Sequence, residues 1–211
     1  MNVRLLAWRG LAAAACMAAL PAAQATNGYF PHGFGLKAKG MGGASLALTH
    51  DAFAGVNNPA QAAWAGNRFD VGAEIFNPQR SATVATPMGP MEVESGKNAF
   101  LIPEMGYNVG VSNRLGVGIT VYGNGGMNTE YPAVFPGDTN FFCSSPTMCG
   151  QGKLGVDLMQ LIVAPTVAYK LTDQHSLGVS PLLVYQSFKA YGLQAFGLPN
   201  QGRDSSTGIG P

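Results

Sequence analysis

The residue types that most often carry catalysis are few in this sequence and lie far apart. The histidines are His32, His50 and His175, and only His50 has an acidic neighbour, Asp51. Ser45 lies among glycines, but no Gly-x-Ser-x-Gly motif surrounds it and no base lies beside it. The sequence also shows no phosphate-binding loop and no cluster of metal ligands. We therefore expect no enzymatic activity, no bound metal and no cofactor.

Two cysteines offer covalent chemistry of a structural kind. Cys143 and Cys149 lie close together in a stretch rich in Ser, Thr, Pro and Gly. In an oxidising compartment, such a pair within one loop favours a disulfide. A redox-active site would need Cys-x-x-Cys spacing, and a zinc site would need further ligands nearby. We therefore predict a Cys143–Cys149 disulfide that stiffens a loop.

The first residues have the pattern of a secretory signal peptide. Two arginines precede an apolar run at residues 10–20, and an Ala-Gln-Ala tripeptide then supplies small residues for cleavage. A lipoprotein signal ending at Cys16 would need a Leu that the preceding alanines do not provide. We expect residues 1–25 to be removed and the mature protein to be exported.

Composition excludes two further classes of protein. The formal net charge is only +1, so no basic field points to nucleic acid as a partner. After the signal, no run of about 18 apolar residues would form a transmembrane helix. The 29 glycines are typical of a chain with many turns and closely packed sheets. The protein is therefore expected to be exported without a helical anchor.

Alternation of apolar and polar residues predicts five β-strands. They cover residues 68–76, 100–111, 114–122, 157–171 and 176–191. In the third of them, Leu115, Val117 and Ile119 alternate with glycines and a polar residue. A period of two is typical of a strand with one apolar face. Pro165 cannot donate to a ladder, so we expect a bulge or bend in the fourth strand.

The connections between these strands alternate in length. Those at residues 112–113 and 172–175 are short, whereas those at residues 77–99, 123–156 and 194–204 are long. Outer-membrane barrels show this asymmetry, with tight periplasmic turns and extended outer loops. A soluble β-sandwich would share the alternation of residues but not this rhythm. We therefore predict an all-β fold, a transmembrane antiparallel β-barrel.

The polar residues expected to face its lumen are Asp70, Glu74, Glu104, Asn108 and Arg114.

A short segment before the first strand, residues 51–64, does not alternate. Asn58 can cap a helix, and Pro59 suits the first helical position because it has no N–H to satisfy. The glycines upstream allow tight turns and close packing. The segment is either a plug inside the lumen or a plain periplasmic extension, and local sequence leaves both open.

Three segments resemble the FadL/TodX family of outer-membrane transporters for long-chain fatty acids and aromatic hydrocarbons. NGYFPHGFGLKAKGMGGASLALTHDAFAGVNNPA, residues 27–60, has a Gly-rich lead, an Asp-Ala step and an Asn-Pro-Ala tripeptide before the first strand. GVDLMQLIVAPTVAYKLTDQHSLGVSPLLVYQSF, residues 155–188, resembles the fourth and fifth strands of that family with their turn. DSSTGIG, residues 204–210, resembles the entry to the sixth. The resemblance spans almost the entire mature chain.

This resemblance implies a barrel of fourteen strands with an N-terminal hatch in its lumen. It assigns residues 26–66 to the hatch and residues 67–211 to the first five or six strands of an incomplete barrel. The hatch motif would be Asn58, Pro59 and Ala60. Substrates of the family bind at the outer loops, pass to a site inside the barrel and leave through a gap beside a kinked third strand. The third strand here ends in the candidate lateral gate Gly123, Asn124, Gly125 and Gly126, which an ordinary turn would also explain.

A carrier of hydrophobic solutes needs apolar patches on its inner wall. The candidates for substrate contact are Phe100, Ile102, Leu182, Val184 and Phe188. Apolar burial contributes about 25 cal/mol per Å², so a few such contacts hold a solute weakly enough to release it. Packing against the plug would explain the same residues equally well. Apolar residues of the 123–156 loop form a candidate capture surface: Met127, Tyr131, Val134, Phe135, Phe141 and Phe142.

We therefore predict passive transport of hydrophobic compounds, fatty acids or aromatic hydrocarbons, across the bacterial outer membrane. The expected partners are these small molecules and outer-membrane lipid, and the expected state is a monomer. A general porin, with a polar and charged constriction, and a structural or adhesive barrel are the alternatives. An open sheet of five or six strands cannot satisfy its edges in lipid, so we expect the N-terminal part of a longer protein.

Overall fold

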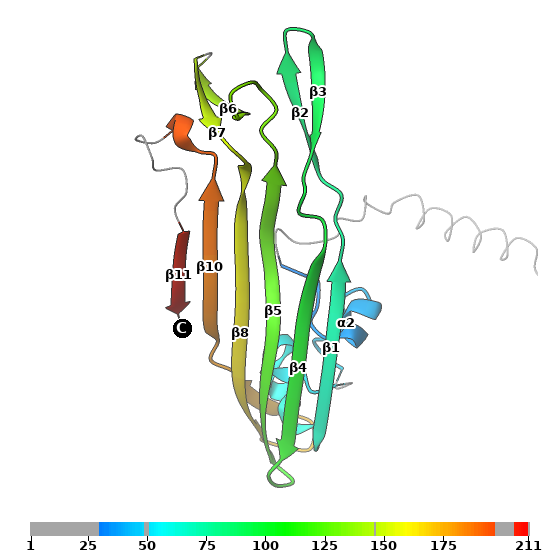
Figure 1. Cartoon of the computed structure of the whole chain (residues 1–211). Helices are drawn as coiled ribbons and strands as arrows, with labels where there is room; N and C mark the ends of the chain where they lie inside the picture. The colour runs from blue at the N-terminus through cyan, green and yellow to red at the C-terminus, as the bar shows by residue number, and fades with distance from the viewer. Residues whose placement is uncertain (1–29, 49–50, 146, 197–204, 211) are drawn as a thin grey trace, which may run out of the picture.

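The computed structural model describes residues 30–48, 51–145, 147–196 and 205–210. The expected signal peptide, residues 1–25, lies outside them. One seven-stranded antiparallel sheet dominates, in the order β1-β4-β5-β8-β10-β11, with β9 also paired to β8 (Figure 1). The strands are β1 (Arg68–Phe76), β4 (Phe100–Gly110), β5 (Leu115–Tyr131), β8 (Leu154–Lys170), β9 (Ser176–Val179), β10 (Leu183–Tyr191) and β11 (Ser205–Gly210). The all-β prediction is confirmed, and the described sheet does not close on itself.

The two faces of this sheet differ in chemistry, as the alternation predicts. On one face, here called the open face, the side chains of Phe69, Val71 and Ile75 are 61%, 71% and 79% exposed. The other, the covered face, carries Glu104 and Asn108, both almost fully buried. Because successive residues of a strand point to opposite faces, the pattern in the sequence translates directly into this division.

The N-terminal segment, residues 30–48 and 51–66, packs on the covered face near the short turns (Figure 1). It contains α2 (Leu36–Gly40), α3 (Ala54–Asn57) and the 3-10 helix η1 (Pro59–Ala63). Glycines of the sheet permit this contact, since a β-carbon at Gly116 would overlap the carbonyl of Ala62, and one at Gly106 would lie 2.5 Å from the oxygen of Ala52. None of the helices in the described residues is long and apolar enough to cross a bilayer.

Two small hairpins extend from the opposite end of the sheet, where the sequence predicted plain loops (Figure 1). They are β2 (Ser81–Thr86) with β3 (Gly89–Glu94), and β6 (Thr139–Ser145) with β7 (Met148–Gln151). Gly89 has a positive φ of 117°, which allows the tight turn between β2 and β3. The long connection predicted at residues 77–99 lies between β1 and β4 as expected, whereas the one predicted at residues 123–156 is shorter, because β5 extends to Tyr131 and β8 begins at Leu154.

Pro165 is accommodated by a break in the neighbouring strand. The predicted strand at residues 176–191 divides into β9 and β10, which pair with β8 up to Val167 and from Val163 onward. Residues 164–166 therefore have no strand partner on that side. Because proline has no N–H to offer, an interruption opposite Pro165 sacrifices little hydrogen bonding. The break also contains Pro181, which has no N–H of its own, so the prediction of one continuous strand at residues 176–191 was wrong.

The third predicted strand continues past its expected end. β5 runs to Tyr131, and it pairs with β8 over this whole length. The glycine-rich stretch at residues 123–126 therefore lies within the strand, where the register shifts, and does not begin a loop. A β-bulge absorbs the irregularity that the glycines would otherwise impose, so the ladder resumes beyond them.

Candidate functional site

Polar side chains of the covered face hold the N-terminal segment in place. Asp70 Oδ2 accepts a hydrogen bond from the backbone N–H of Ala52 at 2.9 Å. Asn108 Nδ2 donates to the carbonyl oxygens of Ala62 and Gly66, at 3.0 and 2.7 Å. Because an irregular segment leaves backbone groups unpaired, these side chains supply the partners that a regular helix or sheet would provide. Asp70 and Asn108, which the alternation predicts to face inward, thus have a structural role, whereas Arg114 is exposed in the turn before β5.

An ion-pair network fastens α2 to the first two strands of the sheet. Lys39 Nζ lies 2.5 Å from Glu74 Oε2 and 3.4 Å from Glu104 Oε2. The backbone N–H of Gly35 also donates to Glu104 Oε2, at 3.1 Å. Glu104 is only 3% exposed, so its charge depends on these partners for stabilisation. Sequence reasoning missed Lys39, because its partners lie 35 and 65 residues away.

The Asn-Pro-Ala tripeptide starts η1 in the manner predicted. Asn58 Oδ1 accepts a hydrogen bond from the N–H of Ala60 at 3.1 Å, and Pro59 occupies the first turn of the helix. Asn58 Nδ2 donates to the carbonyl of Leu46 at 2.8 Å. The carbonyl of Ala60 accepts from Ser176 Oγ of β9 at 3.1 Å. The tripeptide therefore joins the N-terminal segment to itself and to the sheet.

Replacing Asn58 by alanine is expected to destabilise η1 by about 1 kcal/mol, because the cap is lost. The measurement is hydrogen–deuterium exchange at the amides of residues 60–64 in the full-length protein. Asn58→Asp keeps the capping oxygen and loses only the bond to Leu46, so it should exchange more slowly than Asn58→Ala. Equal exchange in the wild type and both variants would contradict the assigned cap.

The pairing between β4 and β5 ends part-way along both strands. The last pair is Glu104 with Tyr122, although β4 remains paired with β1 up to Phe100 and β5 with β8 up to Tyr131. We call this place, residues 100–103 of β4 and 123–126 of β5, the seam. Within the described strands, the seam is where two adjacent long strands run on without pairing to each other. A β-carbon at Gly123 would lie 2.9 Å from Ile102 Cγ2, so the two strands remain close there.

A bulge in β5 lies at the seam. Gly123 pairs with Leu161 and Gly126 with Met159, so β5 contains one residue more than β8 between these pairs. Gly125 has a positive φ of 37°, which its lack of a side chain permits. The additional residue reverses the alternation of β5 beyond this point, as bulges do. The predicted gate residues, 123–126, therefore all lie in this β-bulge.

A row of amide side chains crosses the covered face beside the bulge. Asn124 Nδ2 donates to Gln160 Oε1 at 2.8 Å, and Gln160 Nε2 donates to Gln186 Oε1 at 2.5 Å. An apolar cluster follows on the side of the N-terminal segment, where the rings of Phe34 and Tyr122 have centroids 4.5 Å apart. The row joins three strands, and alternation along one strand does not predict which side chains meet across strands.

Comparison with known proteins identifies the family. The sequence profile described as "Outer membrane protein transport protein (OMPP1/FadL/TodX)" matches residues 12–201. The chain belongs to the FadL/TodX family. The predicted resemblance and the location in the outer membrane are thereby confirmed at the level of the family.

Solved structures share the fold of this FadL/TodX chain. A crystal structure of a Pseudomonas aeruginosa FadL homologue superposes with a TM-score of 0.53 at 16% sequence identity. The alignment covers 79% of this chain and 43% of the homologue, so the chain spans less than half of that protein. A search of curated proteins finds no match.

The candidate substrate contacts of the FadL/TodX chain fall into different environments. Val184 packs on the apolar cluster that also contains Phe34 of the N-terminal segment, and Phe188 lies opposite the buried Leu158. Phe100 is covered by the guanidinium of Arg80, 5.5 Å from its ring centroid. Leu182 is 40% exposed and lies in the break between β9 and β10. Its predicted place on a continuous strand is therefore wrong.

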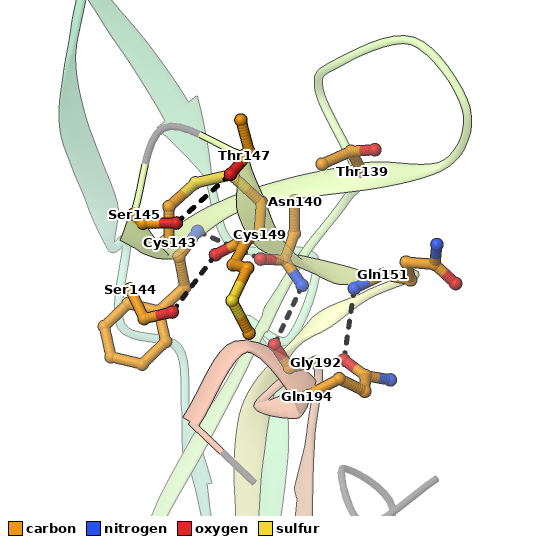
Figure 2. The surroundings of a disulfide bond; sticks show 12 residues. Thr139, Asn140, Cys143, Ser144, Ser145, Thr147, Cys149, Gln151, Gly192 and Gln194 are labelled. Carbon is orange, nitrogen blue, oxygen red and sulfur yellow. Dashed lines mark hydrogen bonds between the residues drawn. A yellow bond between two sulfur atoms is a disulfide. The ribbon is translucent and has the colours of Figure 1, made fainter. Parts of the chain in front are cut away.

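The predicted disulfide between Cys143 and Cys149 is present and joins β6 to β7 (Figure 2). Around it, Asn140 is fully buried and its Nδ2 donates to the carbonyl of Gly192 at 3.0 Å. Gln194 Oε1 accepts from the N–H of Gln151 at 3.1 Å (Figure 2). The disulfide hairpin therefore attaches the end of β10 to the 123–156 region, an arrangement that the sequence did not indicate.

Of the apolar residues expected to form a capture surface, some pack against each other and others are exposed. The rings of Tyr131 and Phe141 pack edge to face, with centroids 5.5 Å apart. Met127 of β5 and Phe142 of β6 have large exposed fractions. In the described residues, no three His, Cys, Asp or Glu side chains lie together as metal ligands. The capture surface stays a prediction.

Proposed function

We propose that this chain forms the plugged wall of an outer-membrane conduit for hydrophobic compounds, either long-chain fatty acids or aromatic hydrocarbons. The observation that carries the proposal is the position of the seam relative to the N-terminal segment. The segment packs on the covered face near the short turns, and the seam lies farther along the strands, toward the hairpins. A solute that enters from the hairpin end reaches the seam before it reaches the plug.

The chemistry of the two faces supports a lateral exit. The open face of the sheet is apolar and suits contact with acyl chains, whereas a direct path along the covered face meets the hydrogen-bonded N-terminal segment. A hydrophobic solute that leaves sideways enters lipid and never has to be rehydrated. At the seam, no β4–β5 backbone ladder has to be broken. In this proposal residues 26–66 are the hatch, residues 123–126 the lateral gate, and the protein acts as a monomer.

The charged residues of the covered face do not favour a general porin. A porin constriction needs charges that face water and a passing solute. Glu74 and Glu104 instead both form ion pairs with Lys39, which fasten α2 to the sheet. The test is uptake of a labelled long-chain fatty acid and of toluene by cells with and without the full-length gene. Gene-dependent flux of hydrophilic sugars, without flux of either hydrophobic compound, would reject the proposal.

Closing the seam covalently should block the exit. Cysteines introduced by Ile102→Cys and Gly123→Cys would lie close enough for a disulfide, because the Gly123 β-carbon position is 2.9 Å from Ile102 Cγ2. We expect the oxidised double variant to lose most hydrophobic uptake and to regain it on reduction. Each single cysteine variant and the wild type, measured with and without reductant, control for the native Cys143–Cys149 bond. Unchanged uptake by the cross-linked protein would exclude the seam as the exit.

A further inference from the structure

We propose that Asn124 makes this conduit selective for hydrophobic solutes that carry a hydroxyl group, by accepting a hydrogen bond from that group. The inference rests on the proposed function and adds the chemical class of solute. The matching ligands are alcohols, phenols and protonated carboxylic acids. Hydrocarbons have no donor, and a carboxylate anion would bring only further acceptors to the same place.

The first argument is the unused acceptor of Asn124. The side chain is only 2% exposed, and its Oδ1 is buried without a hydrogen-bond partner. Its Nδ2 is already committed to Gln160, and Gln160 in turn donates to Gln186. Every bond in the row therefore runs in one direction and leaves an acceptor at its end. Buried acceptors without a donor are rare in proteins. A ligand that supplies the missing donor gains binding free energy, because it makes a hydrogen bond that the free protein lacks.

The second argument is the position of this acceptor. Asn124 lies in the bulge, at the seam through which the solute is proposed to leave. Ile102 lies beside Gly123, and Leu158 with Phe188 provides apolar surface on the strands that carry the amide row. The apolar cluster around Tyr122 lies on the side of the N-terminal segment. A solute whose apolar body occupies this region can place one hydroxyl group against Asn124 while the rest of it meets hydrocarbon.

The test compares ligands that differ only in their donor. Equilibrium binding of 4-propylphenol, 4-propylanisole and propylbenzene is measured on the full-length protein in lipid nanodiscs. The anisole keeps the oxygen and lacks the O–H, and its additional methyl group should favour it by hydrophobicity alone. We expect the wild type nevertheless to bind the phenol about tenfold more tightly than the anisole. Asn124→Leu should remove about this factor for the phenol and leave propylbenzene binding unchanged.

Asn128→Leu is the matched control. It removes the same type of side chain from the same strand, but the Asn128 amide donates to the carbonyl of Leu158 at 3.0 Å and lies outside the row. Its phenol binding should equal that of the wild type. Equal binding of phenol and anisole by the wild type, or equal losses in the two variants, would overturn the role of Asn124. Tighter binding of 4-propylbenzoate than of the phenol at neutral pH would do the same.

The failures of the two proposals give different results. If the wild type binds propylbenzene but shows no preference for the hydroxyl, only the assignment to Asn124 falls. If the wild type binds none of these compounds, the proposed function as a conduit for hydrophobic solutes is rejected, and the role of Asn124 is rejected with it. Retained propylbenzene binding by Asn124→Leu also shows that this variant is folded.

Discussion

Replacing Gly116 by alanine is expected to displace the N-terminal segment and to make the outer membrane permeable to large solutes. A β-carbon at this position would overlap the carbonyl oxygen and carbon of Ala62, and the α-carbon of Ala63 lies 2.8 Å from it. The atoms in the way belong to the backbone of Ala62 and Ala63, so no side chain can rotate away to make room. Overpacking of this kind costs about 3 kcal/mol, which would shift the docking equilibrium roughly a hundredfold.

The measurement is the sensitivity of cells to vancomycin, which is too large for ordinary porins, when they make the full-length variant. Gly110→Ala is the matched control, because Gly110 is the cross-strand partner of Gly116. The nearest atom to a β-carbon at Gly110 is Asn67 Oδ1 at 3.8 Å, an ordinary contact. We expect sensitivity for Gly116→Ala alone. Resistance equal to the wild type in both variants would mean that close packing of the segment does not seal the barrel.

Replacing Lys39 by methionine is expected to weaken the docking of α2 by about 3 kcal/mol. The substitution leaves the buried carboxylate of Glu104 with the N–H of Gly35 as its remaining hydrogen-bond donor, and it leaves Glu74 without its cation. Removing one partner of a buried pair is costly because the other charge stays buried. Hydrogen–deuterium exchange at residues 35–43 of the full-length protein would report the loss as faster exchange.

Lys153→Met provides the comparison for this second prediction. Lys153 Nζ lies 2.8 Å from Glu130 Oε1, but its side chain is 66% exposed. Exposed ion pairs contribute little to stability, so this substitution should leave the exchange of residues 35–43 unchanged. Adding Glu104→Gln to Lys39→Met should restore part of the protection, because the uncompensated charge is then removed. Exchange that is no faster in Lys39→Met than in the wild type would contradict the role of the network.

Several features were predictable from sequence because they depend on neighbouring residues. The first strand was predicted at residues 68–76, and β1 has these bounds. Its alternation determines which side chains share a face, whatever the strand packs against. The cap at Asn58 was likewise predictable, because its partner Ala60 is only two residues away. The Cys143–Cys149 bond followed from two cysteines close together in one loop.

Other features were not predictable, because they depend on what a neighbouring strand offers. Glycines at residues 123–126 look like a turn when read alone, but β8 continues beside them, so β5 resumes after a bulge. The break at residues 180–182 contains Pro181, but its position opposite Pro165 depends on how β8 pairs with β9 and β10. The contacts of Lys39, and the unused oxygen of Asn124, depend on segments that meet only after folding.

The sequence by itself determined that this protein is an all-β chain with one apolar and one polar face, and a capped helical segment before its first strand. These properties follow from the period of two and from local capping, which act over a few residues. The tertiary structure alone decided where β4 and β5 cease to pair, which glycines admit the N-terminal segment, and that buried oxygens such as Asn124 Oδ1 remain without a donor. Each of these depends on the register and distance between segments far apart in the chain, and local preferences do not specify either.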